Sequence, residues 1–155
     1  MSLPKLSVCF AAGLLLAACQ VDKQKVTEQV TTMFKDQLSL TVKKVNCPEK
    51  MNISKGAKYD CDVDVEPEGT VPITVELTDS TGSALISTKY KVVTPDKLAA
   101  DITKQLGVQG TVDCGKRVQI LKPDSSWKCG AKTPDGDHEV EVKVDAEGGL
   151  SYHAL

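Results

Sequence analysis

The chain has 155 residues, with 19 Lys and Arg against 21 Asp and Glu, and a formal net charge of −2. Acidic and basic residues are interspersed, and the sequence has no basic stripe of the kind that neutralises phosphates, so we expect no nucleic-acid partner. Aromatic residues make up only 4% of the chain. Small domains with so few large side chains usually need additional stabilisation, such as a disulfide.

The first 18 residues have the composition of a secretory signal. Lys5 precedes an uncharged stretch over 6–18, which ends in small residues before Cys19. These features match the n-region, h-region and cleavage site of such signals. The stretch is shorter than the roughly 20 apolar residues that span a bilayer. We therefore predict a signal peptide over 1–18 and a short tether over 19–25.

The residues around the predicted cleavage site, Leu16-Ala17-Ala18-Cys19, resemble the lipobox of bacterial lipoproteins. The resemblance implies that the Cys19 thiol is acylated and that cleavage occurs just before it. Two acyl chains attach a protein stably to a membrane, so we predict a membrane partner through the lipid on Cys19. An Asp after the lipidated cysteine marks inner-membrane retention in enterobacterial lipoproteins. Gln20 therefore favours the periplasmic face of the outer membrane.

The remainder of the chain contains an internal repeat. Three features recur in the same order: a V-x-C segment, an aromatic residue two before a second cysteine, and an acidic residue with glycine before an alternating strand. They lie at 45–47 and 112–114, at 59–61 and 127–129, and at 68–75 and 135–144. The pattern predicts two tandem copies of one domain, over 26–93 and 94–155.

Each copy is predicted to be α+β, with a helix followed by an antiparallel sheet of three to four strands. In the second copy Thr94 suits an N-cap, Pro95 the first helical position and Gly107 the helix end. Apolar and polar residues then alternate, which indicates strands with one face against the helix and one in water. We expect one further strand over 84–93, and Pro72 suits an edge strand or a bulge.

Four cysteines follow Cys19 and form two local pairs. In an exported chain such pairs are typical of disulfides, and the repeat predicts Cys47–Cys61 and Cys114–Cys129. Each bond would close a loop of about 15 residues and contribute about 3 kcal/mol. Metal binding and thiol redox chemistry are the alternatives. Both usually place cysteines in C-x-x-C pairs, and this sequence has none.

No catalytic, metal or cofactor site is expected. His138 and His153 are interpreted as surface residues, and no cysteine remains as a nucleophile once both disulfides form. Acidic residues stand at alternate positions over 60–66. They lack the glycine turn and closing glutamate of a calcium loop, so we interpret them as a solvated strand face.

The repeated unit resembles a small bacterial domain of unknown function that occurs behind lipoprotein signals or single membrane anchors, especially in actinobacteria. The residues that carry the resemblance are Cys47-Pro48, Gly56, Tyr59 and Cys61. The second copy departs from the pattern, because Gly115 follows Cys114. The resemblance implies a cell-envelope location and a disulfide, and it supplies no activity.

These observations together predict a cell-envelope lipoprotein with a non-catalytic binding or structural role. The expected partners are envelope proteins or cell-wall material. The alternative function is inhibition of a periplasmic or secreted hydrolase, because a rigid disulfide-stapled scaffold lowers the ordering cost of binding.

Overall fold

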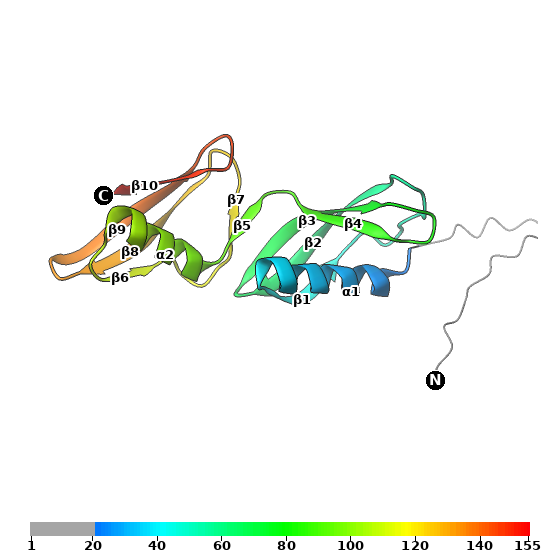
Figure 1. The fold of residues 1–155 in the computed structure, drawn as a ribbon, viewed down its shortest axis with the longest axis horizontal. Helices are drawn as coiled ribbons and strands as arrows, with labels where there is room; N and C mark the ends of the chain where they lie inside the picture. Colours follow the sequence, from blue (N-terminus) through cyan, green and yellow to red (C-terminus); the bar gives the residue numbers. More distant parts are fainter. Residues whose placement is uncertain (1–20) are drawn as a thin grey trace, which may run out of the picture.

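The computed structural model describes residues 21–155, which fold into two α+β units lying end to end (Figure 1). The predicted signal peptide over 1–18 lies outside the described residues, and so does the predicted lipidation site Cys19. The lipobox residues Leu16, Ala17 and Ala18 belong to that signal peptide. In each unit a helix packs on one face of a four-stranded antiparallel sheet. The predicted α+β class is therefore confirmed.

The first unit begins with a helix that continues as a π-helical turn. Its elements are α1 (Lys23–Met33), η1 (Phe34–Leu38), β1 (Thr41–Asn46), β2 (Lys58–Glu66), β3 (Gly69–Leu77) and β4 (Ala84–Thr88). Asp22 caps α1 by accepting a hydrogen bond from the backbone N–H of Gln24. Val26, Val30 and Phe34 recur every four residues and are buried against the sheet. The strand order is β1-β2-β3-β4.

The second unit has the same order of helix and principal strands. Its elements are α2 (Pro95–Leu106), β6 (Thr111–Asp113), β8 (Ser126–Thr133), β9 (Gly136–Val144) and β10 (Leu150–Ala154), with the sheet order β10-β9-β8-β6. The predicted ends of α2 are confirmed. Thr94 caps it by accepting from the Lys97 N–H, Pro95 is its first residue, and Gly107 ends it at φ 62°. Leu98 and Ile102 are fully buried in the core of this unit.

The segment 84–93 does not form one strand, so that prediction is wrong. β4 ends at Thr88, and residues 91–93 form a separate strand, β5 (Lys91–Val93). β5 leaves the first sheet and pairs antiparallel with β7 (Gln119–Leu121), which lies between β6 and β8 in the chain. The chain leaves the first sheet after β4, and the β5–β7 ribbon lies between the two units, as Figure 1 shows.

Val118, just before β7, completes the core of the first unit. Its side chain is 6% exposed and belongs to the first hydrophobic cluster. Its backbone N–H donates to the Glu68 carbonyl at 2.8 Å. The approach is close, because a Cβ atom placed on Gly69 would lie 3.1 Å from the Val118 Cβ. A segment of the second unit is thus buried against the β2–β3 turn of the first.

Pro72 does not place its strand at an edge, because β3 lies between β2 and β4. The Pro72 carbonyl accepts from the Lys89 N–H at 3.0 Å, just beyond the last β3–β4 pair at Ile73 and Thr88. The N and O atoms of an extended residue point to the same side of the strand. The Pro72 nitrogen therefore faces Lys89, and the reciprocal hydrogen bond that another residue would donate there is not made, at the point where the β3–β4 ladder ends.

Candidate functional site

The outer face of the first sheet, which points away from α1, carries most of the charged residues that the sequence singled out. Along β2 the exposed and buried positions alternate as predicted. The acidic residues point outward, whereas Cys61, Val63 and Val65 are buried. The outer face is formed by Lys58, Asp60, Asp62, Asp64 and Glu66 on β2 with Thr70, Thr74 and Glu76 on β3.

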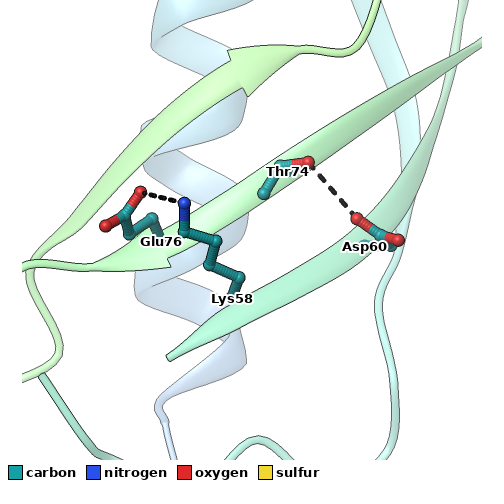
Figure 2. Close-up of polar contacts among 4 residues, drawn as sticks. All are labelled: Lys58, Asp60, Thr74 and Glu76. Carbon is teal, nitrogen blue, oxygen red and sulfur yellow. Dashed lines mark hydrogen bonds and ion pairs between the residues drawn. The ribbon is translucent and has the colours of Figure 1, made fainter. Parts of the chain in front are cut away.

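Polar side chains on this face contact one another across the strands. Figure 2 shows Lys58 pointing to Glu76, with the Lys58 Nζ 3.3 Å from Oε2, and the Thr74 hydroxyl donating to Asp60 at 3.2 Å. The Lys89 ammonium lies 2.7 Å from the other oxygen of Asp60. Its hydrogen bond lowers the pKa of the Asp60 carboxyl, and the Thr74 hydroxyl contributes in the same direction.

The neighbouring carboxylates are also engaged in the sheet. Asp64 accepts from the Thr70 hydroxyl at 2.8 Å and from the Asn46 amide at 3.1 Å, and Lys43 lies 3.1 Å from Glu66. Exposed pairs of this kind each contribute little to stability. Within residues 21–155, no group of three or more His, Cys, Asp or Glu side chains is arranged to hold a metal ion. The arrangement is that of a solvated face with cross-strand pairs.

Both predicted disulfides are present. Cys47 bonds to Cys61 and Cys114 bonds to Cys129, across sequence separations of 14 and 15 residues. Each joins the end of the first strand of a sheet to the strand paired with it. The second cysteine of each pair is buried, at 3% and 2% exposure. The four cysteines are therefore staples of the two cores.

The two histidines lie on the second sheet, and both are exposed. His138 is on β9 opposite Ala131, and His153 is on β10 opposite Glu141. They are on different strands, and neither lies in the core. His138 borders a hollow at the end of the second unit, beside Ala131 and Val140.

Sequence reasoning missed the contribution of Val118 to the first core. One signal was available, because Val118 follows Cys114 by the same number of residues as Met51 follows Cys47. Met51 is 1% exposed and lies in the first core. Equal spacing predicts that both residues are buried, but it does not tell which core receives each of them.

No helix within the described part of the chain combines the length and the apolar character needed to cross a membrane.

The comparisons with known proteins identify a domain but no activity. Neither the curated proteins nor the solved structures contain a match to this chain. Residues 6–82 match the family model described as "Domain of unknown function (DUF4333)". The match spans α1 to β3 and ends in the turn before β4. Over 6–82 the chain is therefore similar to a domain of unknown function, in agreement with the resemblance found in the sequence.

Proposed function

We propose that this protein is a cell-envelope lipoprotein, tethered through Cys19 and carrying two tandem copies of one disulfide-stapled domain, with a non-catalytic binding role. Its partners are other envelope proteins or cell-wall material. The lipid on Cys19 supplies the membrane attachment, and Gln20 favours the periplasmic face of the outer membrane.

The observation that carries this proposal is the lipobox-like segment 16–19 at the end of an uncharged stretch. The two disulfides support it independently. Disulfides persist in oxidising compartments and are rare in the cytosol, so the stapled units fit an exported chain.

The proposal of tandem copies is supported by details beyond the order of elements. In the turn after β3, Asp79 accepts from the backbone N–H groups of Thr81 and Ser83 at 2.7 and 3.1 Å. In the turn after β9, Asp145 accepts from those of Glu147 and Gly149, two and four residues on, at 3.0 and 2.6 Å. The same local motif thus closes the last hairpin of both sheets.

A binding role is favoured over catalysis by the arrangement of the reactive side chains. The four cysteines of residues 21–155 are paired, and the two histidines are exposed on separate strands. On β2, Asp60, Asp64 and Glu66 engage side chains from other parts of the first unit. General acid–base catalysis requires such groups to converge on one substrate position.

A crosslinked pull-down from the native envelope tests the proposal. We expect the wild-type protein in the membrane fraction with a stoichiometric envelope partner or cell-wall material. The Cys19→Ser variant should move to the soluble fraction. Cys9→Ser, which removes the other cysteine of the N-terminal segment, is the matched control and should behave as wild type.

Two outcomes would contradict parts of this proposal. Membrane attachment that survives Cys19→Ser would exclude the lipid tether. Recovery of the wild-type protein without any partner would exclude the binding role. Capture of a single hydrolase, whose activity falls on addition of the protein, would instead establish the inhibitor function.

A further inference from the structure

The end of the second unit contains a hollow of about 670 Å³ between the end of α2 and the β8–β9 turn. Its apolar lining includes Leu106, Val108, Ala131 and Val140. Leu106 is 38% exposed, whereas Leu98 and Ile102 on the same helix are fully buried. Asp135 and His138 form part of the polar rim.

At the corresponding end of the first unit the matching positions hold buried valines, as the residue pairs show. Positions correspond through the disulfides and the strand register, and the pairs are Val63 with Ala131, Val65 with Thr133, and Val71 with His138. The three valines are at most 1% exposed. The second unit replaces them with a smaller side chain and two polar ones, so the end of its core is open.

A segment of the chain covers the end of the first unit. Val118 lies against Gly69 and donates its backbone N–H to the Glu68 carbonyl. The turn that receives it is acidic, with Glu66 and Glu68, whereas the entering segment is basic, with Lys116 and Arg117. The segment bends at Lys116 and Arg117 before β7 begins at Gln119. The first unit therefore binds a basic, bent segment through one apolar side chain.

The second unit presents the same elements without an occupant from its own described chain. Asp135 stands where Glu68 stands in the first turn, and Asp137 adds a second negative charge. A solvent-exposed end would need only polar outer residues. The replacement of Val63 by Ala131 instead opens the interior, and that is the feature of a pocket for a side chain.

We propose that this hollow binds a basic segment of a partner protein through one large apolar side chain. The inference rests on the binding role proposed above and locates it. The occupant side chain is larger than valine, because the hollow has lost the methyl groups of Val63. A second copy of this chain does not supply the segment, since its own Val118 is buried in its first unit.

Fluorescence anisotropy with the full-length lipidated protein in detergent tests the site directly. The probe is a labelled heptapeptide of segment 116–122 carrying Val118→Leu, and the matched control peptide carries Val118→Asp. We expect saturable binding of the leucine peptide. The affinity for the aspartate peptide should be lower by about tenfold or more, because the anchor cannot enter an apolar hollow.

Variants of the protein locate the binding. Ala131→Leu blocks the floor of the hollow and Leu106→Glu adds charge at its rim, and each should weaken binding of the leucine peptide about tenfold. Leu106→Glu leaves the core unchanged, so it remains informative if Ala131→Leu does not fold. Leu85→Glu is the matched control, because Leu85 is 59% exposed on β4 of the first unit and the change should leave affinity unaltered.

The site and the proposed function fail in distinguishable ways. Absence of saturable binding, equal affinity for the two peptides, or unchanged affinity in both hollow variants would overturn the site. An envelope partner retained equally by wild type and by Leu106→Glu would also overturn the site, while leaving the binding function intact. Absence of any partner from the envelope pull-down would overturn the proposed function itself.

Discussion

At the scale of single residues, the Asp79 carboxylate organises the turn between β3 and β4. One carboxylate oxygen accepts from the Thr81 N–H and hydroxyl, both at 2.7 Å, and from the Ser83 N–H at 3.1 Å. The hydrogen bond from the Thr81 hydroxyl is the largest cause that lowers the pKa of the Asp79 carboxyl far below its ordinary value. The side chain and backbone N–H of Ser83 and the backbone N–H of Thr81 act in the same direction. Hydrogen bonds to the charged form favour ionisation, so the ionised carboxylate holds the β3–β4 turn.

We predict that Asp79 contributes acid-sensitive stability. Because its pKa is lower in the folded state than in the unfolded chain, the contribution is complete above the unfolded value of about 3.9 and is lost as pH falls toward the folded pKa. Asp79→Asn should therefore destabilise the protein at neutral pH and progressively less in acid. Unfolding at several pH values measures this, with Asp62→Asn as the control for loss of one negative charge.

This prediction would be contradicted if the difference in free energy of unfolding between Asp79→Asn and wild type stayed constant down to pH 2. A titration of the side-chain carboxyl carbon of Asp79 by NMR is a second check. It should show a midpoint below the model-peptide value, as expected for a carboxylate that accepts three hydrogen bonds.

The sequence predicted the direction of the acidic side chains on β2 because alternation of period two is a property of the strand itself. It did not predict their partners. The Asp60–Lys89 contact joins β2 to a residue beyond the end of β4, and it depends on a register that only the folded sheet fixes.

At the scale of elements, the two helices end in the same backbone conformation with different residues. Ser39 follows η1 at φ 55°, and Gly107 follows α2 at φ 62°. A left-handed residue with a side chain costs about 1 to 2 kcal/mol, whereas glycine adopts this region freely. The first unit therefore carries a strain at its helix end that the second avoids.

This difference predicts that substitutions at the two helix ends change the free energy of unfolding in opposite directions. Ser39→Gly should raise the free energy of unfolding by about 1 kcal/mol, and Gly107→Ser should lower it by a similar amount. Denaturant unfolding measures both variants under the same conditions. Two changes of equal sign would show that the helix ends do not determine these energies.

The predicted boundaries of α2 were correct because its signals are local. Thr94, Pro95 and Gly107 each act within one turn of the chain. The prediction of one strand over 84–93 failed because the partner of β5 is β7, far along the chain. An apolar, β-branched segment indicates a strand, but it does not specify the sheet to which the strand belongs.

At the scale of the whole molecule, the two units use the same loop position differently. Met51 covers the core of its own unit, and its carbonyl accepts from the Val21 N–H at 2.9 Å, just before α1. Val118 enters the neighbouring core instead. Repeat analysis could align these two positions, but the choice between cores depends on the path of the β5–β7 ribbon, which is a tertiary feature.

The burial of Val118 predicts that the stability of the first unit depends on a residue of the second. Val118→Ala removes two methyl groups from a site that is 6% exposed and should cost about 2 kcal/mol. Hydrogen exchange should then show reduced protection of β2 and β3 amides, although Val118 lies between β6 and β8 in the chain. Leu85→Ala, at an exposed position of β4, is the control and should leave this protection unchanged. If only the amides of β5 and β7 lost protection, the two units would open independently, and the buried valine would position the ribbon without stabilising the first core.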